Sequence, residues 1–423
     1  MKKFFAAFLL VSTFFVSLAV LSGCKTNSHK NTFIIWTDRK EMVSYAELFN
    51  SSQNKTKAII VFKTGLSNSL PPARDEEKPD LIIGSWLKNS RTRKNYRELD
   101  ALLGKDSVNT DIFYSQLISY GAVSGKQYLI PVSFDLPLMI FSTKNQEYIS
   151  EKCMVSLDQV KEAAGKYNLT NKDGTYSQMG FGPSWDEDFL YLVTKENGPV
   201  FKEKGTAFSW NQDKLNKSVQ FIKNWTTECN QSTTAELDFE FKYLYTPKYR
   251  QVTSGRTLFA YTTASTIFNI GYEQLNGIDY RWLSINGKLP VRDNIVSMGI
   301  YSKAKNPENA AVFIKWFFQE QNQKLMLERQ EMMQLDTATF GIAGGFSSII
   351  NVNEHIFPAC YRNLLGNLPD TSLLQQPQPF PARWESLKER VIFPYLTAAV
   401  KTDSEKAEPQ MNVLLNDWSK QFN

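Results

Sequence analysis

Residues 128–144 read YLIPVSFDLPLMIFSTK. Apolar residues dominate up to Val132 and again from Leu138 to Phe141, while the break between them is polar and carries a proline. Continuous apolar runs of this length, bounded by such a break, are typical of buried β-strands. The stretch therefore predicts two buried strands joined by a short connection.

Three similar apolar runs precede this stretch, at 32–36, 58–62 and 79–84. Apolar residues between the first and second runs have the spacing of an amphipathic helix, which we expect over 41–50. Because buried strands alternate here with a helix, the pattern favours a mainly parallel sheet covered on both faces.

The second half of the chain alternates in the same way. The pattern predicts helices over 156–167 and 215–226, a strand at 258–261, a long helix from 306, and a loop at 376–381. Ser156 and Gln159 have the spacing of a capping box, which marks a helix start. Pro307 suits the beginning of the long helix, where its missing N–H costs little.

The amino-terminal segment has a different character. It begins Met1-Lys2-Lys3, continues with an apolar run from Phe4 to Val20, and ends in the tetrapeptide LSGC at 21–24. These features resemble a bacterial lipoprotein signal peptide, and the resemblance implies removal of residues 1–23 and acylation of Cys24. A transmembrane helix is the alternative, but it would not need a small residue followed by cysteine. Residues 24–31 are polar, and we interpret them as a lipid-anchored tether.

Composition limits the remaining possibilities. A chain of 423 residues with 42% hydrophobic content is globular and long enough for two domains. A formal net charge of only +5 predicts no nucleic-acid partner. Cys153, Cys229 and Cys360 can form at most one disulfide, and three separate buried thiols fit equally well. No residues have the spacing of zinc ligands or of a phosphate-binding loop, so we expect no metal and no cofactor.

Four stretches together resemble a known family. They are 33–49, which begins FIIWTD; 79–86, which reads PDLIIGSW; 128–144; and 296–317, in which VSMGI precedes KNPENAA. Their order and spacing resemble the extracellular solute-binding proteins of ABC importers, specifically the carbohydrate-binding class related to maltose-binding protein. The likeness runs from about Phe33 to Ala399. Residues 228–248 depart from the family's pattern.

The resemblance implies an α/β fold of the type II periplasmic-binding-protein class. In this fold two α/β lobes are joined by a hinge of several crossings, and a ligand cleft lies between them. The stretch 128–144 looks like the first crossing. We expect residues 32–134 and 286–340 to form the first lobe, and residues 135–285 and 341–423 to form the second.

A carbohydrate site needs aromatic plates for the sugar faces and polar side chains for the hydroxyl edges. Ligands in open α/β sheets lie beyond the carboxyl ends of the strands. Trp36, Asp38 and Arg39 follow the first predicted strand, and Ser85 and Trp86 follow the third. Trp36 could instead end its strand in the core, and Arg39 could pair with Glu41.

Further candidate ligand contacts come from the crossing, from the second lobe and from a glycine-rich turn. They are Phe134 and Asp135; Trp185; Tyr261, Thr263 and Ser265; and Gly344, Gly345 and Phe346. Asp135 could instead pair with a hinge cation, and Trp185 could serve packing between the lobes. The hydroxyls of Thr263 and Ser265 could cap the next helix.

The sequence thus favours a non-enzymatic binding protein. We expect a monomer, anchored through Cys24 to a membrane and facing the periplasm or the cell exterior, that binds a carbohydrate and delivers it to ABC permease subunits. A glycosidase outside the cytoplasm is one alternative, because Asp38 and Asp135 could face one cleft. An interaction lipoprotein without a ligand is the other.

Overall fold

The computed structural model describes residues 31–105, 107–149, 153–204, 207–333, 339–401 and 410–422. The predicted signal peptide, Cys24 and residues 25–30 lie outside the described residues. In the described part of the chain, no helix is long and apolar enough to cross a membrane.

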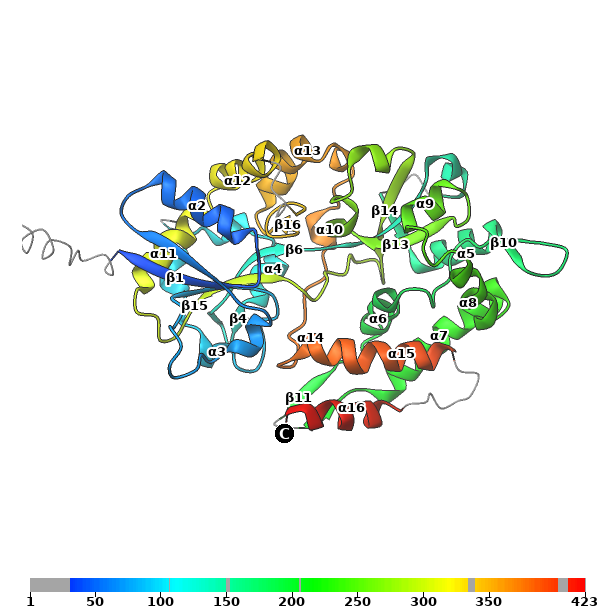
Figure 1. Ribbon diagram of the computed structural model, residues 1–423, viewed down its shortest axis with the longest axis horizontal. Helices are drawn as coiled ribbons and strands as arrows, with labels where there is room; N and C mark the ends of the chain where they lie inside the picture. The colour runs from blue at the N-terminus through cyan, green and yellow to red at the C-terminus, as the bar shows by residue number, and fades with distance from the viewer. Residues whose placement is uncertain are drawn as a thin grey trace, which may run out of the picture.

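Two sheets organise the molecule, and Figure 1 shows one in each half. The first sheet has the order β16-β6-β15-β3-β1-β2. Its strands are β1 (Thr32–Thr37), β2 (Lys57–Phe62), β3 (Leu81–Gly84), β6 (Ile130–Phe134), β15 (Val296–Ile300) and β16 (Phe346–Ser347). The second sheet has the order β13-β7-β14-β8. Its strands are β7 (Pro137–Ser142), β8 (Met154–Ser156), β13 (Phe259–Thr263) and β14 (Ile278–Ser284).

The prediction of a mainly parallel sheet was wrong. In the first sheet β1 pairs in parallel with β2 and β3, but β15 runs antiparallel to both β3 and β6. The physical reason is the connection between the lobes. Because β15 enters the sheet from the edge at which β3 and β6 end, it must run in the opposite direction.

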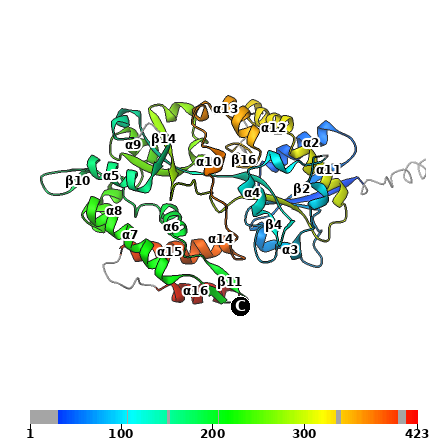
Figure 2. The ribbon, with the colours of Figure 1, turned by 180° about the vertical axis from the view of Figure 1, so that it is seen from behind.

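Helices cover both sheets (Figure 1 and, from behind, Figure 2). Around the first sheet lie α2 (Met42–Ser52), α3 (Thr92–Asn95), α4 (Ser115–Tyr120), α11 (Pro307–Phe317), α12 (Glu320–Met333) and α13 (Phe357–Cys360). The second lobe contains α5 (Leu157–Tyr167), α6 (Glu187–Glu196), α7 (Gln212–Asn230), α8 (Thr233–Lys242), α9 (Lys248–Thr253), α10 (Ala264–Ile267), α14 (Trp384–Leu387), α15 (Phe393–Lys401) and α16 (Met411–Ser419). The capping box predicted at Ser156 and Gln159 opens α5, and Pro307 occupies the first turn of α11.

Shorter elements complete the chain. The two-residue and three-residue strands are β4 (Ala122–Val123), β5 (Lys126–Gln127), β9 (Leu169–Thr170), β10 (Tyr176–Gln178), β11 (Lys202–Lys204) and β12 (Ala207–Ser209). The 3₁₀ and π segments are η1 (Leu66–Ser69), η2 (Asp100–Leu102), η3 (Thr110–Ile112), η4 (Thr143–Tyr148), η5 (Tyr272–Leu275), η6 (Val352–Ile356), η7 (Arg362–Leu364), η8 (Thr371–Leu373), η9 (Lys388–Ile392) and η10 (Lys420–Phe422).

Strand β7 shows how the two cores are divided. Leu138 and Ile140 belong to the core that contains the first sheet, whereas Met139 and Phe141 belong to the core under α5, α6, α7 and α15. Alternate residues of a strand point to opposite faces, so one strand contributes to both cores. The lobes are therefore joined by packed side chains as well as by connecting chain.

Residues just beyond the predicted lobe boundary at 341 pair with the first sheet. Phe346 in β16 pairs with Phe134 in the first sheet, and residues up to Leu374 belong to the first core. The chain joins the second core only from Trp384 onward. A two-residue strand such as β16 carries too few residues to show a periodicity, so the sequence pattern did not reveal it.

Candidate functional site

The carboxyl ends of β1 and β3 place four predicted residues side by side at the edge that faces the second lobe. Asp38 and Arg39 follow β1, and Ser85 and Trp86 follow β3. Arg39 Nε lies 3.1 Å from Asp38 Oδ1, and the Arg39 guanidinium also donates to the Ser85 hydroxyl. The Ser85 amide donates to Asp38 Oδ2 over 3.3 Å. We call Asp38, Arg39, Ser85 and Trp86 the first wall.

Trp86 has an unusual backbone for a bulky residue. Its φ is +63°, in the left-handed region that non-glycine residues rarely adopt. Such a conformation costs roughly 1–3 kcal/mol and is found most often at functional sites. The Trp86 side chain is partly buried, and it extends from the first lobe to pack against the buried core of the second. The strain therefore positions an aromatic ring between the lobes.

Lys388 meets Trp86 from the second lobe. The Lys388 side chain is buried, and its ammonium lies 5.2 Å from the Trp86 ring centre, 5.2 Å from that of Tyr191 and 5.4 Å from that of Phe393. In the described part of the chain, no carboxylate lies within 4.0 Å of this ammonium. Burial lowers the pKa of Lys388, and the nearby Asp293 carboxylate opposes that shift.

Asp293 anchors the groups around Lys388. Lys195 Nζ lies 2.8 Å from Asp293 Oδ1, the Tyr191 hydroxyl donates to the same carboxylate, and Trp384 Nε1 donates to it over 3.2 Å. Although burial raises the pKa of Asp293, Lys195 and Lys388 hold it below its ordinary value.

Glu385, one turn before Lys388, approaches the first wall. Burial raises the pKa of Glu385, Glu389 and Asp38 raise it further, and a hydrogen bond from Trp86 opposes the rise. The 5.2 Å between the Lys388 ammonium and the Trp86 ring centre shows that the two lobes are close at this point. We call Tyr191, Lys195, Asp293, Glu385 and Lys388 the second wall.

The connections between the lobes hold a third group, the hinge cluster of Asp135, Asp188, Tyr261, Ser265 and Arg292. Asp135 is buried and accepts hydrogen bonds from the Leu136 amide at 2.9 Å, the Ser265 amide at 3.0 Å and the Ser265 hydroxyl at 2.5 Å. Burial raises the pKa of Asp135, while Arg292, 3.9 Å away, and Ser265 lower it.

Arg292 connects this cluster to helix α6. Its Nη2 lies 2.7 Å from Asp188 Oδ2, and the Tyr261 hydroxyl donates to the same oxygen over 3.2 Å. Three predicted contacts, Asp135, Tyr261 and Ser265, thus have structural partners in the hinge. Thr263 accepts a hydrogen bond from the Thr266 amide and caps α10, which is the alternative that the sequence allowed.

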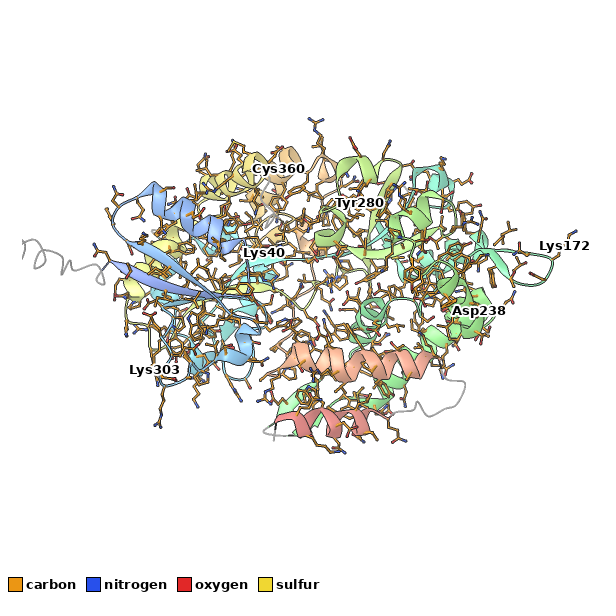
Figure 3. All side chains as sticks on the ribbon, in the orientation of Figure 1. Lys40, Lys172, Asp238, Tyr280, Lys303 and Cys360 are labelled. Carbon is orange, nitrogen blue, oxygen red and sulfur yellow. The ribbon has the colours of Figure 1, made fainter. Side chains whose placement is uncertain are left out.

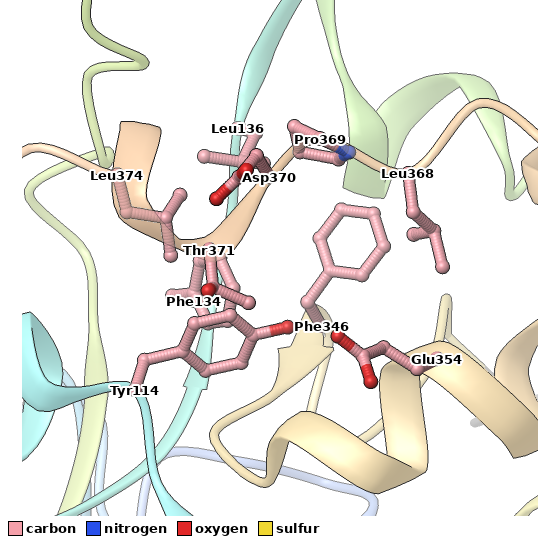
Figure 4. Close-up of a pocket in the computed structure, with 10 residues that line it drawn as sticks. All are labelled: Tyr114, Phe134, Leu136, Phe346, Glu354, Leu368, Pro369, Asp370, Thr371 and Leu374. Carbon is pink, nitrogen blue, oxygen red and sulfur yellow. The ribbon is translucent and has the colours of Figure 1, made fainter.

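A hollow of about 440 Å³ lies beside the crossing from β6 to β7 (Figure 4). It is lined by Tyr114, Phe134, Leu136, Phe346, Glu354, Leu368, Pro369, Asp370, Thr371 and Leu374. The rings of Phe134 and Phe346 are 5.7 Å apart, and the ring of Tyr114 is 5.3 Å from Phe134. Two predicted ligand contacts, Phe134 and Phe346, therefore lie in this hollow and not in either wall.

The remaining predicted residues are dispersed. Trp36 is buried with 1% of its surface exposed, in the core position that the sequence also allowed. The Trp185 ring stacks on Phe239 within the second lobe, with ring centres 5.7 Å apart. Gly344 has a φ of +81°, and a side chain added there would come within 4.0 Å of Arg39. A Cβ at Gly345 would lie 2.4 Å from the Phe134 carbonyl oxygen.

Sequence reasoning missed most of the second wall. Tyr191 and Lys388 lie on helical segments, where their spacing resembles an ordinary packed face. The charged pair Arg292 and Asp293, placed just before the predicted strand of VSMGI, was the available signal. The three cysteines Cys153, Cys229 and Cys360 are half-buried free thiols.

No protein-family model matches the chain, and no curated protein matches it. Several solved structures do match the chain. An ABC substrate-binding protein from Listeria monocytogenes in complex with cycloalternan is 12% identical, with a TM-score of 0.60, over 93% of this chain and 99% of the other. The GacH receptor of Streptomyces glaucescens is 14% identical, with a TM-score of 0.58, over 92% and 97%.

The maltose/maltodextrin-binding domain MalE of Bdellovibrio bacteriovorus, bound to maltotriose, is 16% identical, with a TM-score of 0.55, over 92% of this chain and all of the other. At these identities the likeness shows the fold. The chain has the two-lobed α/β fold of the sugar-binding, family 1 extracellular solute-binding proteins of ABC importers, and the fold prediction is confirmed.

Proposed function

We propose that this protein is the solute-binding component of an ABC importer and that it binds a carbohydrate between the first and second walls. The observation that carries the proposal is the meeting of Trp86 with Lys388 and Glu385 at the junction of two lobes. Structural neighbours bind maltotriose, cycloalternan and acarbose, which supports a saccharide as the ligand.

The walls offer the chemistry that a sugar requires. The Trp86 ring supplies an apolar plate for a sugar face at little cost in side-chain entropy. Asp38 and Arg39 remain 20% and 25% exposed and can accept from and donate to hydroxyl groups. Lys388 adds a donor whose ammonium, among the residues that the structure describes, has no carboxylate within 4.0 Å. A saccharide that contacts both walls would favour the closed arrangement of the lobes, as in hinge closure.

Lipid anchoring completes the proposal. Cleavage after residue 23 and acylation of Cys24 would hold the protein at a membrane surface, facing the periplasm or the cell exterior. Stable anchoring needs more than one acyl chain, which a lipoprotein amino terminus supplies. The protein would then deliver its ligand, as a monomer, to the permease subunits in the same membrane.

The carboxylates of Asp38 and Asp135 fit a binding protein better than they fit a glycosidase. Asp38 pairs with Arg39, and Asp135 accepts three hydrogen bonds from Leu136 and Ser265. An acid and a nucleophile for glycoside hydrolysis would need to face the substrate across about 5 to 10 Å. Both carboxylates are instead directed at structural partners.

Calorimetric titration tests the proposal. The chain that begins at Lys25 contains every described element and would be titrated with maltose, maltotriose, mannobiose, mannotriose and a wider panel of saccharides. We expect one class to bind with a Kd of about 1 µM or tighter. An absence of heat across the panel would contradict the carbohydrate proposal and favour an interaction lipoprotein.

A further inference from the structure

Residues 241–250, which read FKYLYTPKYR, form an unusual segment that spans the end of α8, the turn after it and the start of α9. It contains four aromatic residues, one leucine and three basic residues, and it has no acidic residue. It overlaps the region 228–248 that departs from the family's pattern. Lys248 contacts Tyr261 of the hinge cluster, and the exposed apolar side chains of the segment belong to neither wall. We call residues 241–250 the aromatic-basic tip.

Three apolar side chains of the tip point into solvent. Phe241 is 78% exposed, Leu244 is 56% exposed and Tyr245 is 95% exposed. Single exposed apolar residues are common on protein surfaces, but three within five residues form a patch that marks an interaction site.

The tip is held in place, so its exposure belongs to the fold. Phe239, just before it, stacks on Trp185 and contacts the Tyr243 ring with centres 5.0 Å apart. The Thr246 amide donates to the Tyr243 carbonyl over 2.8 Å, and Gln251 Nε2 donates to the Thr246 carbonyl over 2.9 Å. These contacts fix the turn while leaving the outer side chains uncovered.

Cations lie over the two partly buried rings of the tip, beside the exposed side chains. Lys242 and Arg256 lie 5.6 and 5.3 Å from the Tyr243 ring centre, and Arg250 lies 5.5 Å from that of Tyr249. Lys248 is different, because it pairs with Asp186. The nearest acidic residues along the chain, Asp238 and Glu240, precede the tip on α8, and burial raises the pKa of Glu240.

We propose that the aromatic-basic tip binds the surface of a membrane that contains anionic phospholipid. Aromatic rings prefer the level of the lipid headgroups, and lysine and arginine are attracted to anionic lipids. The tip combines both in one exposed turn, as interfacial segments do. The proposal concerns the surface of the second lobe and does not require a ligand between the walls.

The position of the tip suits this role. The tip follows α8, near the end of the molecule where Asp238 and Lys172 are labelled in Figure 3, whereas β1 begins at the opposite end of the long axis (Figure 1). A lipid-anchored amino terminus and a membrane-bound tip would therefore lay the long axis along the membrane.

Vesicle sedimentation tests the proposal. The chain from Lys25 would be mixed with vesicles of phosphatidylcholine alone or of phosphatidylcholine with phosphatidylglycerol. We expect binding to the anionic vesicles that weakens with added salt, and we expect the triple variant Phe241→Ser, Leu244→Ser, Tyr245→Ser to lower the bound fraction about tenfold. The matched control is Leu365→Ser, which changes an apolar residue that is 73% exposed in another part of the molecule.

The outcomes separate the possible partners. Equal binding of the wild type and the triple variant, or no preference for anionic vesicles, would overturn the proposal and leave a protein partner as the explanation of the patch. Thermal unfolding and saccharide titration of the triple variant should match those of the wild type, so a loss of vesicle binding cannot come from misfolding. Failure of the carbohydrate proposal would leave the vesicle result unchanged.

Discussion

The first and second walls face each other across one junction, yet they hold their charges differently. In the first wall Asp38 and Arg39 form a partly exposed pair at the ends of two strands. In the second wall Asp293 is buried and satisfies Lys195, Tyr191 and Trp384 at once. Buried ionic groups depend on one another far more than exposed ones do. Changes in the second wall should therefore affect stability, and changes in the first wall should affect binding.

The largest effect is expected from Asp293→Ala. The substitution leaves the ammonium of Lys195 in a poorly solvated site without its nearest anion, so the free energy of unfolding should fall by about 3–5 kcal/mol. Urea unfolding followed by circular dichroism measures it. The control is Asp417→Ala, which removes an exposed partner of Lys420 and should change stability by less than about 0.5 kcal/mol. A loss for Asp293→Ala no larger than that of the control would show that the second wall is not a coupled network.

In contrast to Asp293→Ala, the substitution Trp86→Ala should weaken ligand binding strongly and change stability little. We expect the affinity for the bound saccharide to fall by more than about tenfold, because the plate between the walls is lost. Stability should stay within about 1 kcal/mol, since the Trp86 side chain is only partly buried. Titration calorimetry and urea unfolding on the same samples give both values. Tyr245→Ala, far from the junction, should leave the affinity unchanged; a stability loss of Trp86→Ala without a loss of affinity would place the ring in the core instead.

Lys388→Met tests whether Lys388, unlike Asp293, contributes to binding more than to stability. Methionine keeps most of the volume but removes an ammonium that is costly to bury, so stability should change by less than about 1 kcal/mol. Affinity should fall severalfold, because a donor to the ligand is lost. Parallel unfolding and titration check both parts. If stability falls as far as it does in Asp293→Ala, Lys388 is a structural member of the buried network.

The smallest expected effect is the contribution of Glu385 to the pH dependence of stability. The folded-state pKa of Glu385 is raised above its ordinary value of 4.5, chiefly by burial. Its contribution to stability is therefore fully present below pH 4.5 and is lost as the pH rises through the raised value. Glu385→Gln should flatten that part of the stability curve, measured by urea unfolding at a series of pH values. Glu77→Gln, at an exposed position elsewhere in the first lobe, serves as control. An unchanged slope in Glu385→Gln would contradict the burial of this carboxyl between the walls.

The difference between the two walls also explains which parts of the fold and of the candidate site could be predicted from the sequence. The first wall lies at strand ends, whereas Lys388 and Tyr191 of the second wall lie on helical segments. Strands such as 130–134 and 137–142 are nearly continuous apolar runs, and the ends of parallel strands share an edge, so Asp38 and Trp86 could be placed together. Lys388 and Tyr191 lie on helical segments whose rotation toward the junction depends on tertiary packing. Phe346 was predicted as a ligand contact from the glycine-rich turn, but it lines the hollow beside Phe134 and belongs to neither wall. The sequence could not show this, because β16 is too short to show a pattern.

The central claim is that a carbohydrate binds between the two walls. Amide hydrogen exchange of the wild-type protein, with and without the saccharide that calorimetry identifies, tests it most directly. The account predicts added protection both at 84–89, next to Trp86, and at 384–391, around Lys388, because the ligand closes one wall on the other. Protection confined to one lobe, or found only in the segments that line the hollow of Phe134 and Phe346, would contradict it.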